Sequence, residues 1–490
     1  MFILSAYTIV YFCFALNRAL KRPLWLDEVS TLWMCRLPDL GHIWGVLASS
    51  APDTAPPAFY AISRVILHLT GNDRIGIRLL SVVGFYATQI GIFLFTRVRL
   101  GAAVGLFAML LPIATAGLAY ATDGRPYAAV LGSFAMAVWF WQSSGENTSW
   151  RTALGLWLSL SIAIALHFFA ILILIPIAVA EATRTFTRRK IDWQCWAAII
   201  ASVAPLVIYF PLIIRMRTAA LAAASAPSYY ARPTFRALID AYQQLFAPPG
   251  WGALIALAAV AFLAVRFVWP SSEEPGGRSG FDVSETVLAI CLLLFPLFVY
   301  AFARLLTNTF HVRYSLPAIF GYCLVAAALL ALLPQRTVLA LLLSTIQLSI
   351  MAVGSFRELR RMPGTPDIEV LQSVREDLPI VVAQGLNFIQ LMENAPSGLR
   401  DRLVYLPVPD GIPNTDPTND IIVKNWAQIY PLPVYSASEF LAGHSRFILY
   451  HTGLIDETLT DWALRTAGNV TILEHKGDQW VFLISPQSRP

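Results

Sequence analysis

Acidic and basic residues gather in four short segments of this sequence, each beside a long apolar run. The first segment is LWLDE, in which Asp27 and Glu28 follow apolar and aromatic residues. Carboxylates in such surroundings at a membrane boundary are costly unless they are solvated or paired. One of the two can therefore be a general base or bind a substrate. The same pair can equally well cap a following helix, with Asp27 near its N-terminus.

The next two segments contribute two more acids and an arginine. APDTAPPAFY places Asp53 before a proline pair that can begin a helix, so Asp53 is more simply a turn residue than a cavity residue. ATDGRPYA places Asp123 and Arg125 in a short turn between two apolar runs. Arg125 can bind an anionic headgroup there, while Asp123 orients the arginine or a sugar hydroxyl. Alternatively, the two residues simply pair with each other.

The fourth segment, RLLTNTFHVRYSLPAIF, carries Arg304, His311, Arg313 and Tyr314 just before a predicted helix. Arginine makes bidentate, permanently charged contacts to phosphate, which suits a phosphate-binding site. The same side chains can instead be interface anchors whose charged heads reach toward water. A further histidine, His167 in LHFF, lies at the end of another apolar run. A lone histidine in such a place is more often a satisfied interfacial residue than a ligand.

The composition is that of a membrane protein. Of 490 residues, 57% are hydrophobic and only 13% are charged, whereas a soluble protein carries about 25% charged residues. The net charge of +5 comes without a basic segment interleaved with aromatic residues, which argues against nucleic-acid binding. The five cysteines form no CxxC pair, so we expect neither a disulfide framework nor a zinc site.

About eleven apolar runs approach the length of about 20 residues that a membrane-crossing helix needs. They predict an all-α polytopic membrane domain over residues 1–354. The first run is expected to be a retained helix, because no small-residue cleavage site follows it. The fifth and sixth runs can also be one tilted span with a re-entrant piece. The runs lie near 2–17, 77–96, 102–119, 126–142, 153–167, 168–183, 194–213, 251–269, 285–303, 315–333 and 336–354.

Basic residues set the predicted orientation of these runs. The densest basic cluster lies at 184–190, which places that loop in the cytoplasm. Counting spans outward from it also puts the N-terminus and the loop 270–284 inside. A short amphipathic helix at 58–69 is expected to lie in the membrane interface. The segments predicted on the extracytoplasmic side are 18–76, 120–125, 214–250, 304–314 and the residues after about 355.

Residues 355–490 differ in character and predict a C-terminal soluble α/β domain on the extracytoplasmic side. Their apolar runs are short and bounded by Pro, Gly, Asn and Asp, and strands that alternate with helices indicate this fold class. Lys476-Gly477-Asp478 is a turn signal within a hairpin. The predicted strands are 378–385, 402–407 and 446–453, the helices 386–395 and 456–468, and the hairpin 469–485.

Taken in order, LWLDE, DTAPPAFY, DGRPYA and HVRYSLPA resemble the motifs of the polyprenyl-phosphate-sugar-dependent glycosyltransferases of the GT-C superfamily. The most similar group is the bacterial relatives of dolichyl-phosphate-mannose–protein mannosyltransferase and of the lipid A aminoarabinose transferase. In that group an aspartate–glutamate pair follows the first span. A D-T-H-P-P-L-Y-Y-like segment, an E-A-R-P-Y-like turn and an R-Y-L-L-P-like helix start come after it. Each motif alone is weak, but four in order on a multi-span scaffold are much more specific.

The resemblance implies a GT-C-like fold and an enzyme of the cell inner membrane that works at its extracytoplasmic face. Such an enzyme moves a sugar from a polyprenyl-phosphate carrier to a glycan, lipid or protein acceptor. It requires no nucleotide or other cofactor, because the donor is already activated, and a divalent cation is optional. The implied site residues are the catalytic Asp27 and Glu28; Arg125, His311, Arg313 and Tyr314 at the donor phosphate; and Asp53, Asp123 and His167 in support.

The sequence departs from the family pattern at Ala55, where relatives carry His or Lys before the proline pair. That position often contacts the donor phosphate, so other cationic groups must hold it here. Two other functions therefore stay open. A transporter or flippase of a lipid-linked sugar would also use charged residues, although usually deep within its spans. An inactive scaffold of an envelope polysaccharide complex would need no intact donor site.

Overall fold

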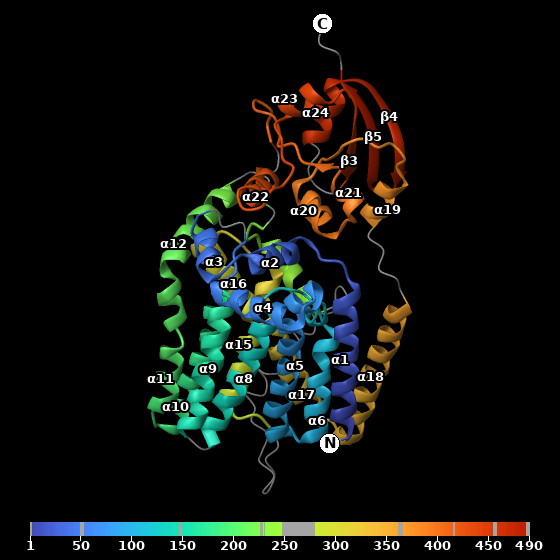
Figure 1. Ribbon diagram of the computed structural model, residues 1–490. Helices are drawn as coiled ribbons and strands as arrows, with labels where there is room; N and C mark the ends of the chain where they lie inside the picture. Colours follow the sequence, from blue (N-terminus) through green and yellow to red (C-terminus); the bar gives the residue numbers. More distant parts are fainter. Residues whose placement is uncertain are drawn as a thin grey trace.

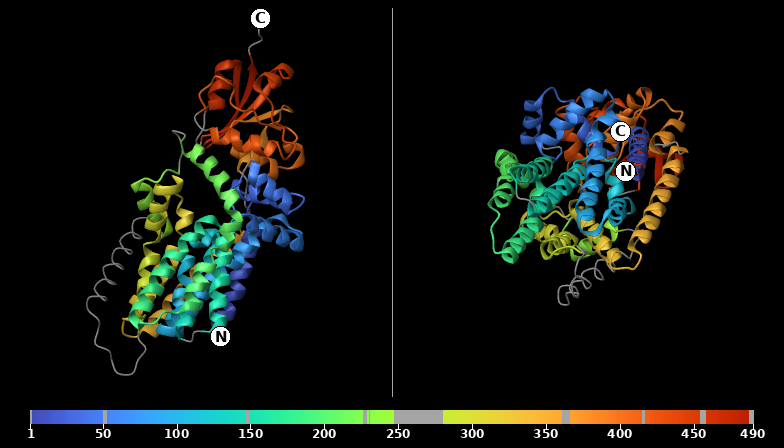
Figure 2. Two further views of the ribbon diagram at one scale, coloured as in Figure 1. Left: turned by 90° about the vertical axis from the view of Figure 1, so that its left-hand side faces the viewer. Right: turned by 90° about the horizontal axis from the view of Figure 1, so that it is seen from below.

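A bundle of long helices carries a smaller part with a β-sheet at one end, as the computed structural model shows in three views (Figures 1 and 2). The C-terminal residues lie in the smaller part, and the first helix begins at the far end of the bundle. The structure describes residues 2–49, 53–146, 149–225, 229, 231–246, 280–360, 366–414, 417–453 and 458–486.

The bundle is built from helices throughout, and four short 3₁₀ or π segments (η1–η4) join or extend them. Its elements are α1 (Phe2–Lys21), α2 (Leu26–Arg36), α3 (Leu40–Ser49), α4 (Pro57–Thr70), α5 (Asp73–Leu100), α6 (Ala102–Leu110), η1 (Leu111–Ala114), α7 (Gly117–Tyr120), α8 (Tyr127–Glu146), α9 (Trp150–Leu166), η2 (Phe168–Ile173), α10 (Leu174–Arg188), α11 (Trp193–Ala201), α12 (Ala204–Ser225), α13 (Phe235–Leu245), α15 (Val283–Leu293), α16 (Phe295–Phe302), η3 (Ala303–Thr307), η4 (Val312–Ser315), α17 (Pro317–Ala331) and α18 (Arg336–Arg360).

Every apolar run predicted within the described residues falls on a helix, but the count of eleven spans is not confirmed. By length and composition, four of the described helices can cross a membrane, and a pair bent by 53° makes a fifth if it is one span. The run predicted at 251–269 and most of the loop at 270–284 lie outside the described residues. The four helices are Asp73–Leu100, Phe168–Arg188, Trp193–Thr218 and Arg336–Gly354, and the bent pair is Val283–Leu293 with Phe295–Thr307.

Several predicted spans are shorter than a bilayer-crossing helix because the chain bends within or beside them. Ala102–Ala114, Trp150–Leu166 and Pro317–Ala331 are apolar but have at most 17 residues. The runs at 153–167 and 168–183 are two helices, because His167 leaves the helical conformation and ends α9. Helix α4 confirms the short helix predicted at 58–69, and its exposed Ile62, Val65 and Leu69 suit a membrane interface.

Close packing of α5 against α8 fixes the turn that precedes α8. A Cβ atom on Gly84 would lie 2.4 Å from the Cα of Ala129, and one on Gly132 would lie 2.2 Å from the carbonyl oxygen of Gly84. Only glycine allows the two backbones to approach so closely, as small residues do at membrane helix interfaces. The turn with Asp123 and Arg125 is therefore held beside the N-terminal half of α5, where Ser81 Oγ donates to the Arg125 carbonyl at 2.7 Å.

The C-terminal part is a five-stranded sheet covered by helices. The strand order is β2-β1-β3-β5-β4. Strands β2, β1 and β3 are parallel to one another, and β5 is antiparallel to both of its neighbours, β3 and β4. Gly477, with φ of +66°, makes the predicted turn between β4 and β5. The elements are α19 (Pro366–Ser373), β1 (Ile380–Val382), α20 (Gly385–Asn394), α21 (Ser397–Arg400), β2 (Leu403–Val404), α22 (Pro417–Ala427), α23 (Ala437–Gly443), β3 (Phe447–Thr452), α24 (Thr458–Thr466), β4 (Ala467–Lys476) and β5 (Gln479–Pro486).

Each strand and helix predicted in this part is found within a few residues of its expected place. Helix α18 continues to Arg360, past the predicted start of the part at residue 355. The sequence analysis did not identify α19, which precedes β1, or α21, α22 and α23, which lie between strands.

Candidate active site

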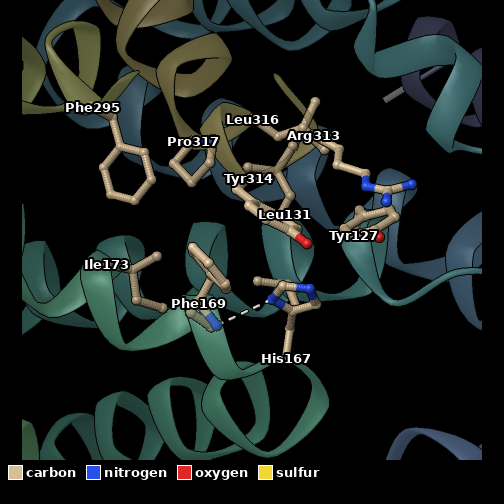
Figure 3. A pocket seen from close by; sticks show the side chains of 12 residues that line it. Tyr127, Leu131, His167, Phe169, Ile173, Phe295, Arg313, Tyr314, Leu316 and Pro317 are labelled. Carbon is tan, nitrogen blue, oxygen red and sulfur yellow. Dashed lines mark hydrogen bonds between the residues drawn. The ribbon is translucent and has the colours of Figure 1, made fainter. Parts of the chain in front are cut away.

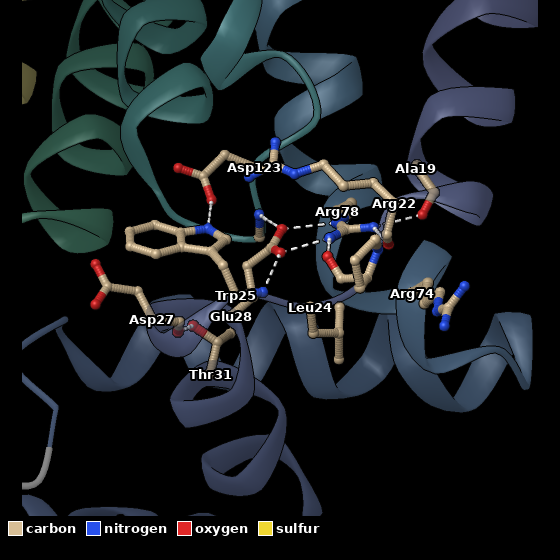
Figure 4. A network of polar contacts seen from close by, with 12 residues as sticks. Ala19, Arg22, Leu24, Trp25, Asp27, Glu28, Thr31, Arg74, Arg78 and Asp123 are labelled. Carbon is tan, nitrogen blue, oxygen red and sulfur yellow. Dashed lines mark hydrogen bonds and ion pairs between the residues drawn. The ribbon is translucent and has the colours of Figure 1, made fainter. Parts of the chain in front are cut away.

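Glu28, not Asp27, caps the start of helix α2. Its side chain is completely buried, and its two oxygens accept hydrogen bonds from Arg78 at 2.6 and 2.5 Å. The backbone N–H groups of Gly124 and Trp25 donate to the same carboxylate at 2.8 and 3.2 Å (Figure 4). Glu28 therefore joins α2, α5 and the turn before α8, and its position favours a structural role over contact with a substrate.

Arg78 is the partner that sequence reasoning missed. Besides Glu28, its guanidinium donates to the carbonyl oxygens of Ala19, Arg22 and Pro23 at 2.6, 2.8 and 3.0 Å. The signal was present, because an arginine one residue into the apolar run at 77–96 must find partners. The guanidinium fixes the linker between α1 and α2, and thereby the place where α2 begins.

Asp27 points to the other side of α2, away from the Glu28–Arg78 pair (Figure 4). Its side chain is 23% exposed, and its Oδ2 accepts a hydrogen bond from Arg313 Nη1 at 2.9 Å. Arg125 Nε lies 3.9 Å from the same oxygen. An accessible carboxylate in this place can reach the hydroxyl of a bound acceptor, which is what a general base requires.

Arg125 and Asp53 form a bidentate ion pair. Arg125 Nη1 and Nη2 donate to the two oxygens of Asp53 at 2.6 and 2.9 Å, and Nη1 also contacts Thr31 Oγ1 at 3.1 Å. Burial alone would raise the pKa of the Asp53 carboxyl, but the Arg125 guanidinium outweighs burial and lowers it. Asp53 is therefore more than the turn residue that the sequence favoured, and it orients Arg125 beside Asp27.

Asp123 does not pair directly with Arg125 but accepts a hydrogen bond from the indole of Trp25. Trp25 Nε1 lies 2.9 Å from Asp123 Oδ1, and Asp123 is only 6% exposed. Burial, assisted by the nearby charge of Glu28, raises the pKa of Asp123 to about 7, although the Trp25 bond and Arg125 oppose the rise. Asp123 is therefore partly protonated near neutral pH.

This raised pKa gives a testable pH dependence of stability. The folded protein binds the proton of Asp123 more tightly than the unfolded chain between the ordinary pKa of 3.8 and about 7, so this carboxyl lowers stability as pH rises through that window. Asp123→Asn keeps an oxygen for Trp25 but cannot ionise. We expect the melting temperature of the variant, relative to that of the wild type, to increase as pH rises from about 4 to about 8. A melting-temperature difference that stays constant over this range contradicts the assignment.

Two tyrosine rings lie beside the guanidinium group of Arg313. The guanidinium carbon of Arg313 lies 5.5 Å from the ring centre of Tyr127 and 6.0 Å from that of Tyr314. Tyr314 stacks on Phe169 at 4.1 Å and lies 5.1 Å from the ring of His167. The pocket in Figure 3 has these polar groups at one end and apolar side chains such as those of Phe295 and Ile173 at the other.

Both predicted histidines belong to this aromatic cluster and are neutral. His167 Nδ1 accepts a hydrogen bond from the backbone N–H of Phe169 at 3.2 Å, which fixes the start of η2. The ring of His311 meets Tyr314 edge-on at 5.4 Å. Burial, followed by the charge of nearby arginines, lowers the pKa of each histidine to about 3. The positive charge of the site therefore comes from Arg125 and Arg313.

Two buried donors at the centre of the site lack a hydrogen-bond partner among the described residues. They are the Nε–H groups of Arg125 and Arg313, whose guanidinium groups flank Asp27. Buried donors are almost always satisfied, and an unsatisfied one costs about 1–3 kcal/mol. An anion between the two arginines would satisfy them.

No cluster of three or more His, Cys, Asp or Glu side chains suited to a metal ion occurs among the described residues. At the site, Asp27 and Asp53 face guanidinium groups and Asp123 faces an indole. The residues present therefore fit an anionic ligand better than a cation.

Comparison with known proteins adds a family match over part of the chain. Residues 54–214 match the family model described as dolichyl-phosphate-mannose-protein mannosyltransferase. No curated protein matches the sequence. The solved structure of ArnT from Cupriavidus metallidurans bound to undecaprenyl phosphate aligns with a TM-score of 0.42 at 15% identity, over 99% of this chain and 98% of that chain. The oligosaccharyltransferase of Archaeoglobus fulgidus in complex with zinc and sulfate aligns with a TM-score of 0.44 at 9% identity, over 80% of this chain and 62% of that one.

The matched segment contains PPAFY and DGRPYA, two of the four motifs on which the resemblance was based. The family match confirms that resemblance: over residues 54–214 this chain is similar to the mannosyltransferases of the GT-C superfamily.

Proposed function

We propose that the protein is a membrane glycosyltransferase that moves a sugar from a polyprenyl-phosphate carrier to a hydroxyl of a glycan, lipid or protein acceptor. One observation carries the proposal. Asp27 and Arg313 are 286 positions apart in the sequence, yet they meet at 2.9 Å beside a second arginine, Arg125. A carboxylate base and two phosphate-binding cations in one place are what this reaction needs.

In the proposed reaction, Asp27 removes the proton of the acceptor hydroxyl, whose oxygen attacks the anomeric carbon of the donor sugar. The bond from that carbon to the phosphate oxygen breaks, and polyprenyl phosphate leaves with one more negative charge. The unpartnered Nε–H groups of Arg125 and Arg313 can donate to the phosphate where this charge grows. Removing one such donor in other enzymes costs about 10²–10³-fold in rate.

The other residues position these three groups. Asp53 holds Arg125 through two hydrogen bonds, while Glu28 and Arg78 set the start of α2. The rings of Tyr127 and Tyr314 confine the Arg313 side chain, and Phe169 stacks on Tyr314. Ala55 leaves no cation before the proline pair, so the two arginines carry the phosphate charge in this proposal. The reaction needs no cofactor, and the proposal includes no metal step.

The site is proposed to face the extracytoplasmic side of the inner membrane. The basic cluster at 184–190 lies at the end of α10, which is predicted to be cytoplasmic. Figure 1 shows this end of α10 and α2 at opposite ends of the helix bundle. The C-terminal part lies beyond α2, so it would share the extracytoplasmic side with the site.

The decisive experiment uses the full-length protein in lipid nanodiscs with synthetic polyprenyl-phosphate sugars. Mass spectrometry of envelope lipids and glycans from a deletion strain identifies the missing sugar and the carrier-linked donor that accumulates. The purified protein is then expected to transfer that sugar and release polyprenyl phosphate. Accumulated donor on the cytoplasmic side alone would favour a flippase. A normal set of glycans with a disrupted envelope complex would favour a scaffold.

Arg313→Ala is expected to weaken use of the donor much more than use of the acceptor. Loss of a charged hydrogen bond to phosphate costs about 1.5–3 kcal/mol, or about 10- to 100-fold in kcat/KM for the donor. Arg313→Lys keeps the charge and should recover part of the loss. Arg304→Ala, at an exposed arginine of η3, is the matched control and should act like the wild type. An effect confined to the acceptor KM would exclude a role at the phosphate.

A further inference from the structure

The C-terminal part binds the linker that precedes helix α2, and Asp27 lies in the first turn of that helix. The side-chain amide of Asn394, at the end of α20, makes two hydrogen bonds to the backbone of Leu24, in the linker between α1 and α2. Leu24 N–H donates to Asn394 Oδ1 at 3.1 Å, and Asn394 Nδ2 donates to the Leu24 carbonyl at 2.8 Å. Leu24 is 4% exposed. This pair of bonds spans 370 positions of sequence and joins the two parts of the molecule.

A second set of contacts holds the last turn of α2. Glu393 Oε2 accepts hydrogen bonds from Trp33 Nε1 at 2.8 Å and from Arg36 Nη1 at 3.0 Å. Tyr430 donates its hydroxyl to the Trp33 carbonyl at 2.6 Å, and the Trp33 ring packs edge-on against Trp426 at 5.2 Å. The C-terminal part therefore holds the last turn of α2 as well as the linker that precedes the helix.

The same linker is held from the bundle side by Arg78, which binds the carbonyl groups of Arg22 and Pro23. Residues 22–24 thus lie between a guanidinium of the bundle and an amide of the C-terminal part. Asp27 lies in the first turn of the helix that follows. A shift of the linker would move the Asp27 carboxylate relative to Arg313.

We propose that Asn394 and Glu393 are positioning residues for Asp27, so that the C-terminal part is an integral piece of the active site's support. The inference rests on the proposed function of Asp27 as the base. Misplacement of a reacting group by about 1 Å can cost about 10²-fold in rate. The C-terminal part therefore contributes to turnover without touching the reacting atoms.

The test compares two asparagine-to-leucine variants on the same helix. Asn394→Leu keeps the branched shape of the side chain but removes both bonds to Leu24, together with the bond to the Gln390 carbonyl in the same helix. Asn387→Leu is the control, because the Asn387 amide bonds only within the C-terminal part, to Gln384 at 2.9 Å and Thr452 at 2.7 Å. We expect Asn394→Leu to lower kcat about 10- to 100-fold with both KM values unchanged, and Asn387→Leu to leave kcat within about twofold.

A second readout does not depend on activity. Hydrogen–deuterium exchange of the peptide covering residues 22–30 should speed up in Asn394→Leu, because the Leu24 amide loses its acceptor, and should stay unchanged in Asn387→Leu. Asn394→Asp keeps that acceptor and should give intermediate exchange and turnover. Unchanged exchange, or faster exchange with normal kcat, overturns the positioning role. A wild type that transfers no sugar from any donor ends the proposed function instead, and the exchange result still decides whether Asn394 holds the linker.

Discussion

Asp27→Asn is expected to lower kcat by about 10²–10⁴-fold, which is the usual contribution of a general base. Asparagine has the same shape and still offers an oxygen to Arg313, 2.9 Å away, but it cannot accept a proton from the acceptor. The fold should survive, because the Asp27 side chain is partly exposed and does not cap α2. The measurement is kcat at saturating donor and acceptor, together with the melting temperature.

The matched control is Asp39→Asn, an exposed aspartate in the turn after α2 whose carboxylate contacts His42. It should keep wild-type turnover. Donor binding by Asp27→Asn should also persist, because Arg125 and Arg313 remain. Turnover that is unchanged in Asp27→Asn would remove the base from the proposal and revive the scaffold alternative. Loss of donor binding with normal kcat would instead make Asp27 a donor ligand.

The sequence could place the acids and arginines on one face, but it could not divide the roles of Asp27 and Glu28. Both residues are carboxylates in the first turn of the same helix. What separates them is distant in sequence: Arg78 lies 50 positions from Glu28, and Gly124 lies 96 positions away. The capping role that the sequence offered for the pair belongs to Glu28, whereas the role of base, proposed here for Asp27, stays a prediction.

The same distinction between local and distant information holds for the fold. The strands and the hairpin of the C-terminal part were predictable because alternation and the turn at Gly477 are local signals. Their order was not predictable, since β1 lies between β2 and β3 through contacts across many residues. Nor could apolar length reveal that α15 and α16 meet at a bend of 53°. The attachment of Asn394 to Leu24 had no sequence signal at all.

Glu28→Gln is expected to cause a large loss of stability, whereas Asp27→Asn, at the neighbouring position, should leave stability nearly unchanged. Glu28 and Arg78 form an ion pair whose two side chains are completely buried. Removing one charge of a buried pair leaves the other uncompensated and typically costs about 3–5 kcal/mol. Glutamine also presents an amide N–H₂ group where two of the four donors now point to carboxylate oxygens. Thermal unfolding in detergent should show a sharply lower melting temperature.

The double variant Glu28→Gln with Arg78→Gln distinguishes a lost ion pair from general damage to this region. It leaves no buried charge unpaired, so we expect it to be more stable than Glu28→Gln alone, by a coupling of about 1–3 kcal/mol. Purified Glu28→Gln with a normal melting temperature but no turnover would contradict the structural role and return Glu28 to the reaction. The two adjacent carboxylates thus have opposite expected effects. Asp27 should control the rate with little effect on stability. Glu28 should control stability and affect the rate only through the position of α2.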